Sequence, residues 1–296
     1  LYLYKFLYFE FKNGFRDLFK IPTSKNFYIS LQIKLECAVT FNPFNGPEIS
    51  QVTPITESQM EIWLSCALGG EQANSAYNES NSLHFKGLVN VTALEQALVA
   101  LVERHESLRS SFSGNGKFMV VYKNLPNPLT FIDISGLPVP ERRAALEEVL
   151  LQDSLHVFNL IDGPLFKATL LKLAEQDYYF VFTGHHLIID GWSIGVIMQE
   201  LGKFYSSFVE GKELNLPLSK SFSEFAIEQK QFLASESYQE IEKFWLDQFK
   251  SNVPVLSLPT DQLRPKTKTY KSQRLNFELD PMLVSSLKKL GFKVGG

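Results

Sequence analysis

Two adjacent histidines, His185 and His186, are the residues best suited to chemistry in this chain of 296 residues. They follow the apolar run 178–183 and precede Asp190 and Gly191, so that the local sequence is HHLIIDG. An imidazole has an unperturbed pKa of about 6.5 and can therefore accept or donate a proton near neutrality. Neighbouring side chains at a strand end point in opposite directions. We therefore expect one histidine to face a cleft and the other to pack or hydrogen-bond inside the fold.

The residues around this pair leave several structural interpretations open. Asp190 could cap the following helix or pair with a buried arginine, and Gly191 fits a tight turn or a close approach of backbone or substrate. A buried histidine pair followed by an ordinary Asp-Gly turn is the alternative without chemistry. A metal site is disfavoured, because neighbouring histidines on a strand cannot both reach one ion. Serine hydrolase chemistry is weaker still, since no GxSxG elbow is present and Ser193 would be an unsupported nucleophile.

Alternating strands and helices must position this segment. Hydrophobic periodicity and capping signals predict helices at 56–68, 91–103, 142–154, 194–208, most of 221–249 with a break near 234–237, and 281–290. Apolar runs predict strands at 82–85, 118–122, 129–134, 165–171, 178–183 and 274–279. Three prolines in 254–265 exclude regular helix and predict an extended crossing segment. The pattern indicates an α+β fold, a mixed α/β sandwich.

Composition and charge restrict the classes of partner. The chain is 45% hydrophobic with a formal net charge of −3, which is typical of a globular protein and gives no reason to expect nucleic acid or an anionic membrane. Cys37 and Cys66 form neither a disulfide framework nor a metal-ligand spacing. A reducing, cytoplasmic location is therefore expected.

The first residues differ from the rest, because ten of the first 31 are Phe or Tyr. Charged residues interrupt this segment before any run reaches the ~18 apolar residues of a membrane span, and it lacks the features of a signal peptide. The chain begins with Leu1, and its first methionine is Met60. We therefore expect residues 1–52 to be an upstream linker or spurious extension, and the chain to be cut from a longer protein.

Several motifs together carry a resemblance to a known family. HHLIIDGWS resembles the core motif of condensation domains of nonribosomal peptide synthetases, which share their fold and HHxxxDG motif with chloramphenicol acetyltransferase and related CoA-dependent acyltransferases. Residues 56–68 resemble the first family motif, with Gln59 and Trp63 in register. RHESLRSSF at 104–112 is similar to RHExLRTxF, and FSEFA at 222–226 resembles YxDFA. LPTDQLRP at 258–265 matches LPTDxxRP, and the motifs occur in family order over residues 53–280.

The resemblance implies a fold, a reaction and a reactive residue. It implies a complete chloramphenicol acetyltransferase-like first lobe at 53–220 and the truncated start of a second lobe at 221–296. The family joins an upstream acyl or peptidyl thioester to the amine of a downstream aminoacyl thioester. His186 would face the cleft, either as general base or as a hydrogen-bonding group for the amine and the tetrahedral intermediate. His185 would support it from inside the fold.

The resemblance also assigns roles to neighbouring residues. In the family the motif aspartate is mainly structural and pairs with an arginine, so Arg109, or else Arg104, is expected to pair with Asp190. A solvated helix end is the alternative for Arg104, His105, Glu106 and Arg109. His105 is expected to be packed or hydrogen-bonded. Trp63 and Trp192 are expected to be core aromatics and Cys66 a small buried hydrophobe.

Partners and cofactors follow from the same resemblance. Upstream and downstream carrier domains would bring the phosphopantetheine arms, an adenylation domain is expected in the same parent chain, and no cofactor or metal would be bound by this domain. The segments TESQMEIW and AYNES also resemble condensation domains fed by a polyketide module. Two other functions stay open: a non-catalytic carrier-docking domain, and a stand-alone acyltransferase that uses CoA thioesters. The chain alone is expected to be inactive, because the cleft lies between two lobes.

Overall fold

A computed structural model describes residues 46–251, 253, 256–263, 265, 268–272 and 277–295. Contacts divide the chain into residues 1–46 and 47–296, and all the helices and strands given below belong to the second unit. Residues 1–45 of the expected N-terminal extension therefore lie outside the described residues, whereas residues 49–52, which were also assigned to it, belong to a described strand, Ile49–Pro54.

The described part of the chain alternates strands with helices. Its α-helices are α3 (Glu57–Ala76), α4 (Val91–Arg104), α5 (Val139–Ser154), α6 (Gly191–Glu210), α7 (Phe222–Leu233), α8 (Glu236–Gln248) and α9 (Pro281–Val294), with a 3-10 turn η1 (Glu106–Arg109). Its strands are β1 (Ile49–Pro54), β2 (Asn78–Lys86), β3 (Ser110–Phe112), β4 (Phe118–Tyr122), β5 (Leu129–Asp133), β6 (Phe166–Ala174) and β7 (Asp177–His185).

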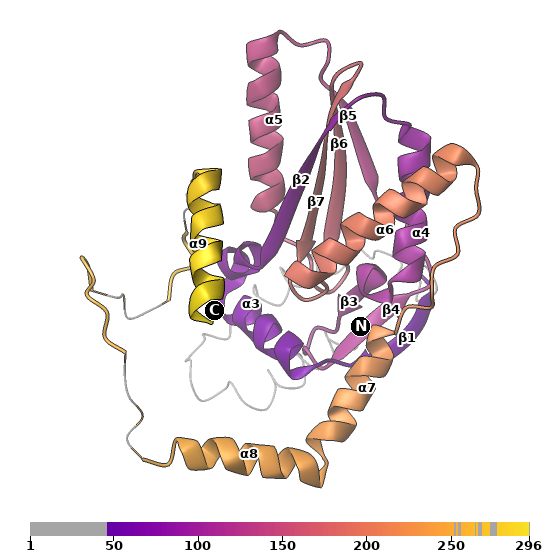
Figure 1. Cartoon of the computed structure of the whole chain (residues 1–296). Helices are drawn as coiled ribbons and strands as arrows, with labels where there is room; N and C mark the ends of the chain where they lie inside the picture. The colour runs from indigo at the N-terminus through magenta and orange to yellow at the C-terminus, as the bar shows by residue number, and fades with distance from the viewer. Residues whose placement is uncertain are drawn as a thin grey trace, which may run out of the picture. The chain divides into compact units, whose positions relative to one another are not determined.

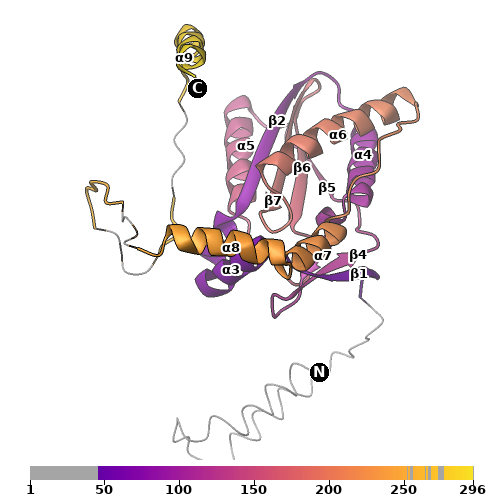
Figure 2. The same ribbon diagram turned by 60° about the horizontal axis from the view of Figure 1, so that its bottom comes forward.

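The larger sheet has the strand order β2-β7-β6-β5 and carries the histidine pair at the end of β7. β7 is antiparallel to both neighbours, and β5 runs parallel to β6. Helix α5 covers one face of this sheet, whereas α4 and α6 cover the other (Figure 1, Figure 2). Because β7 is central and covered on both faces, its apolar run is continuous rather than alternating.

Successive side chains of β7 are buried in two different hydrophobic clusters. Phe180 and Phe182 are fully buried in the cluster that includes α4 and α6, and the ring of Phe182 stacks on Phe166 at a centroid distance of 5.5 Å. Val181, between them, is buried in the smaller cluster with Leu146 of α5. Burial of each such side chain contributes about 1.5–3 kcal/mol. The strand is therefore held rigidly on both faces up to the histidines.

The smaller sheet has the order β1-β4-β3, and its strands are antiparallel. Met119 and Val121 of β4 are buried in the same cluster as α4. Gly116, in the turn before β4, has a φ of +65°, and a Cβ there would lie 2.4 Å from the ring of Trp63. Trp63 thus packs against the core through a contact that only glycine permits, as expected for a core aromatic.

The expected mixed α/β class is confirmed, and most expected elements are present within a few residues of their predicted limits. The helix predicted at 91–103 spans Val91–Arg104, and the break predicted near 234–237 separates α7 from α8. Three elements, β1, β3 and η1, were not predicted, because they are short and have no apolar periodicity of their own. β1 and β3 are strands because they pair with β4, and not because their own residues favour strand structure.

Two predicted segments differ in detail. The helix expected to end at residue 68 resumes after Gly70, whose φ of 62° and ψ of −149° interrupt α3, and it continues to Ala76. Residues 256–263 have no helix or strand, as the prolines predicted. The strand expected at 274–279 lies partly outside the described residues, and its described part, 277–279, is not in a strand.

Candidate active site

The two histidines at the end of β7 face opposite ways, as predicted. His185 is 0% exposed, whereas the side chain of His186 is 35% exposed. The backbone N–H of His185 donates to Leu165 O at 2.9 Å, and that of His186 donates to Tyr77 O at 2.8 Å. Both neighbouring strands therefore hold the backbone of the pair, and only His186 presents its ring outward.

The orientation of the His186 ring is fixed by its own loop. Its Nδ1 lies 2.7 Å from the carbonyl oxygen of Ile189. Because a carbonyl oxygen can only accept a hydrogen bond, Nδ1 carries the proton in the neutral ring. The lone pair then lies on Nε2, at the far side of the ring from this loop. His186 is therefore arranged to accept a proton or a hydrogen bond through Nε2.

His185 has the opposite tautomer and a structural environment. Its Nδ1 accepts a hydrogen bond from the Leu187 N–H at 3.2 Å, so that its proton lies on Nε2, which is 3.8 Å from Cys66 Sγ. Burial, together with the charge of His186, lowers the pKa of His185 to about 4. Burial likewise raises the pKa of the Cys66 thiol to about 11. Both groups are therefore neutral near pH 7, and Cys66 is the small buried hydrophobe that was expected.

The loop after the histidines is anchored by a residue from α3. Gln59, which is buried, donates from Nε2 to Leu187 O at 2.9 Å. The Oε1 of the same side chain accepts from the Thr56 N–H at 3.1 Å, and Thr56 Oγ1 accepts from the Gln59 N–H at 3.3 Å. This capping box fixes the Gln59 side chain. The first-motif glutamine therefore ties the start of α3 to the loop that orients His186.

Gly184 was not predicted as a site residue, although the conformation of the loop requires it. A Cβ at this position would lie 2.4 Å from Ile189 Cδ1. The absence of a side chain lets Ile189 fold back over the strand end, and the Ile189 carbonyl then meets the His186 ring. A glycine directly before a histidine pair at a strand end was the available signal.

Replacing Gln59 with methionine tests this anchor. The change keeps the length of the side chain and removes the hydrogen bonds of its amide, leaving the Leu187 carbonyl without its partner. We expect a loss of about 1–3 kcal/mol in the free energy of unfolding, measured by urea denaturation. Gln152→Met, on the exposed side of α5, is the matched control and is expected to change it by less than about 0.5 kcal/mol. Equal effects of the two substitutions would contradict the anchoring role.

Asp190 caps helix α6, which was one of the two alternatives for it. Its Oδ1 accepts from the Ser193 N–H at 2.8 Å and from the Ser193 hydroxyl at 2.6 Å. Both hydrogen bonds lower the pKa of Asp190, and the one from the Ser193 hydroxyl has the larger effect. The cap places the start of α6 directly after the histidine loop and stabilises it by about 0.5–2 kcal/mol.

The predicted pairing of Asp190 with an arginine is wrong in this structure. Arg104 Nε instead contacts Glu200 Oε2 at 3.0 Å, and Arg109 donates from Nη1 to Tyr122 O at 2.6 Å. Glu200 lies ten residues beyond Asp190 along α6. At a rise of 1.5 Å per residue, this is about 15 Å from the cap. The packing of α4 on α6 therefore places Arg104 beside the middle of α6 and away from its start.

Gly191 does not have the conformation that was expected. It is the first residue of α6, its φ is not positive, and a Cβ there would meet no atom within 4 Å. The predicted tight turn is therefore wrong, whereas room for a substrate at this position stays a prediction. Trp192, the next residue, is 85% exposed, so that its predicted place in the core is also wrong. Helix position N2 points it away from the cluster that α6 covers.

The RHE segment, residues 104–106, holds the chain that leads into α7. His105 Nε2 contacts Glu200 Oε2 at 2.7 Å, as expected for a hydrogen-bonded residue. Burial raises the pKa of Glu200, but hydrogen bonds from His105 and Arg104 outweigh it and the pKa is lowered. Glu106 accepts from the Ser221 hydroxyl and from the Ser223 N–H. The alternative of a solvated helix end is therefore wrong for this segment.

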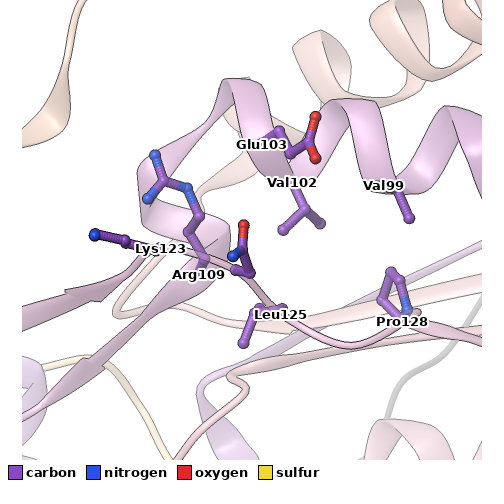
Figure 3. A pocket seen from close by; sticks show the side chains of 8 residues that line it. Val99, Val102, Glu103, Arg109, Lys123, Leu125 and Pro128 are labelled. Atoms are coloured by element: carbon purple, nitrogen blue, oxygen red, sulfur yellow. The ribbon is translucent and has the colours of Figure 1, made fainter. Parts of the chain in front are cut away.

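Two pockets lie near these arginines rather than at His186. The larger, of about 440 Å³, is lined by residues 104–107, 109, 219–222 and 225. The smaller, of about 20 Å³, lies between Val99, Arg109 and Pro128 and has room for about one water molecule (Figure 3). His186 lines neither pocket.

The described residues also bear on metal binding and on membrane spans. Among these residues, no three His, Cys, Asp or Glu side chains are grouped so that they could hold a metal ion. None of the described helices combines the length and apolar character needed to cross a membrane.

Known proteins similar to this chain are synthetases. A family model, Condensation domain, matches residues 49–292. Tyrocidine synthase 3 of Brevibacillus parabrevis is 30% identical over 275 residues, which cover 92% of this chain and 4% of that protein. Phosphinothricin tripeptide synthetase PhsC of Streptomyces viridochromogenes is 31% identical over 252 residues, which cover 84% of this chain and 23% of that protein. The chain thus spans a small part of these relatives.

Two solved structures have a similar fold. The starter condensation domain of the rhizomide synthetase RzmA matches with a TM-score of 0.61 and 24% identity, over 67% of this chain and 48% of that chain. The X-domain in complex with OxyB from teicoplanin biosynthesis matches with a TM-score of 0.62 and 25% identity, over 77% of this chain and 48% of that one. The chain spans about half of each. With the family model matching most of its length, the chain belongs to the condensation domain family of nonribosomal peptide synthetases.

Proposed function

We propose that this chain forms part of a domain that joins a carrier-bound acyl or peptidyl thioester to the amine of a carrier-bound aminoacyl group. The observation that carries this proposal is the 2.7 Å contact between His186 Nδ1 and Ile189 O, which assigns the proton to Nδ1 and leaves the lone pair of Nε2 to accept a proton. The side chain of His186 is 35% exposed, so that its ring is partly open to a substrate. Membership of the condensation domain family supplies the class of reaction.

In the proposed reaction, the neutral amine attacks the thioester carbonyl. A C–N bond forms, the C–S bond breaks, and the tetrahedral intermediate between these steps carries a negative oxygen. His186 Nε2 accepts a proton from the amine and returns it to the departing thiolate, so that the products are an amide and a free carrier thiol. Proton transfer of this kind contributes typically about 10²–10⁴-fold to a rate. Because both thioesters are held on carriers, their high effective molarity contributes much of the remaining rate enhancement.

The partners in this proposal are the upstream and downstream carrier domains, with an adenylation domain that loads the downstream one. The phosphopantetheine arms belong to the carriers, and the domain itself contributes no cofactor to the chemistry. We also propose that the 296-residue chain does not turn over by itself. Support comes from its coverage of about half of the solved domains and from the C-terminal end of α8, where Phe244, Trp245 and Phe249 are each more than half exposed.

One comparison of acyl donors tests the proposal in the complete synthetase. The downstream carrier is loaded with its amino acid, and the acyl group is offered either on the upstream carrier or on CoA. We expect product from the carrier-bound donor, and little from CoA or from the isolated 296-residue chain. Product formed equally well from the CoA thioester would favour a stand-alone acyltransferase. Carrier binding without product from either donor would favour a docking domain.

A further inference from the structure

A carboxylate lies beside His186, on the neighbouring strand. Glu79 Oε1 is 3.8 Å from His186 Nδ1, and the Glu79 side chain is 31% exposed. This distance is too long for a hydrogen bond and short enough for a direct electrostatic interaction. The same Nδ1 donates to Ile189 O at 2.7 Å. The Glu79 carboxylate therefore lies close to an Nδ1 proton that is already hydrogen-bonded to Ile189 O.

Strand pairing fixes Glu79 in this place. In the register of β2 with β7, Glu79 is directly opposite Gly184, two residues before His186. Diagonal neighbours two residues apart on antiparallel strands lie on the same face and within reach of long side chains. Because Gly184 has no side chain, the space opposite Glu79 is shared by the Ile189 side chain and the His186 ring. Glu79 is therefore directed to this ring by the sheet itself.

No other described residue forms a hydrogen bond or an ion pair with the Glu79 carboxylate. Burying part of a carboxylate without such partners is unfavourable, unless a positive charge appears nearby. Among the described residues, Asp190 is a second carboxylate that interacts with the charge of His186, and its Oδ1 accepts two hydrogen bonds from Ser193. His185, on the other side, is neutral near pH 7. Glu79 is thus a carboxylate beside the ring to which no described group donates a hydrogen bond, and its charge lies near Nδ1.

We propose that Glu79 is a positioning residue for His186, stabilising its ring in the protonated form that arises during amide formation. This inference rests on the proposed function. As the ring accepts the amine proton on Nε2, it becomes an imidazolium, and its Nδ1–H faces both Ile189 O and the Glu79 carboxylate. Glu79 does not touch the substrate in this proposal and acts only through the ring.

A double-mutant cycle in the complete synthetase tests the proposal. Glu79→Gln keeps the shape and removes the charge, and we expect kcat for amide formation to fall about tenfold with KM for the loaded acceptor carrier unchanged. Glu79→Asp is expected to recover most of the lost rate. Glu210→Gln is the matched control and is expected to leave kcat unchanged. Glu210 is the last residue of α6, at the end of the helix away from Asp190.

The cycle is completed in a His186→Ala background. If Glu79 acts through His186, Glu79→Gln has no further effect on the residual rate in that background. A Glu79→Gln variant with the kcat of the parent would overturn the inference, as would an equal loss in both backgrounds. Failure of the proposed function has a different signature, because His186→Ala would then itself retain the full rate.

Discussion

Replacing His186 with alanine is expected to lower the rate of amide formation by about 10²–10⁴-fold in the complete synthetase. The substitution removes Nε2, the nitrogen proposed to accept the amine proton, and the fixed tautomer that keeps it available. The rate is measured by rapid mixing of synthetase whose two carriers have been loaded beforehand, so that loading does not limit the observed step. Carrier loading itself is expected to be unchanged.

Two further variants separate chemistry from folding. His84→Ala removes a histidine from β2 that pairs with Asp177 near the other end of the sheet, and it is expected to retain the parent rate. His186→Gln preserves a side chain that can donate to Ile189 O, but it lacks a nitrogen able to take a proton. It is therefore expected to be as slow as His186→Ala. Amide formation at the parent rate by either His186 variant would contradict the catalytic assignment.

Acidification is expected to destabilise the fold through His185. Its pKa is about 4 in the folded chain, against 6.5 for an ordinary histidine, because burial and the charge of His186 disfavour the protonated ring. As the pH falls below about 6.5, the unfolded chain binds a proton that the folded chain does not, and stability decreases. The loss continues until the pH reaches about 4, below which both states are protonated. A difference of this size corresponds to roughly 3 kcal/mol.

The measurement is the free energy of unfolding between pH 7 and pH 4 for the parent and for His185→Gln. Burial also lowers the pKa of His156, so that the pH dependence of stability in the parent is not due to His185 alone. The difference in pH dependence between the parent and His185→Gln isolates the contribution of His185. The parent is expected to lose more stability over this range. If His185→Gln does not fold, the NMR titration of the His185 ring in the parent replaces it. A midpoint near 6.5 would contradict the buried, neutral assignment.

The sequence was most informative where a pattern depends on near neighbours. The helix at 91–104 followed from apolar residues at helical spacing, and the opposite directions of His185 and His186 followed from strand geometry. The capping role of Asp190 was one of two alternatives, because aspartate before a helix is a common cap. Each of these inferences needs only a few consecutive residues.

Contacts between distant segments could not be predicted in the same way. Gln59 and Leu187 are 128 residues apart, and nothing local to either indicates that the amide of one holds the carbonyl of the other. The Arg104–Glu200 pair depends on how α4 lies against α6, so that the sequence could not exclude Arg104 as a partner of Asp190. Glu79 reaches His186 only through the register of β2 with β7. Tertiary packing determines which of these residues meet, and the residues near each of them in the sequence do not indicate its distant partner.

The most direct test of the central claim is the intact mass of the downstream carrier after one turnover. Parent synthetase is loaded with the acyl group upstream and the amino acid downstream, and the reaction is stopped before product release. The account predicts that the downstream carrier gains the mass of the acyl group through an amide bond, and that the same experiment with His186→Ala leaves the aminoacyl mass unchanged. An acyl group that stays on the upstream carrier in the parent, or transfers equally well without His186, would contradict it.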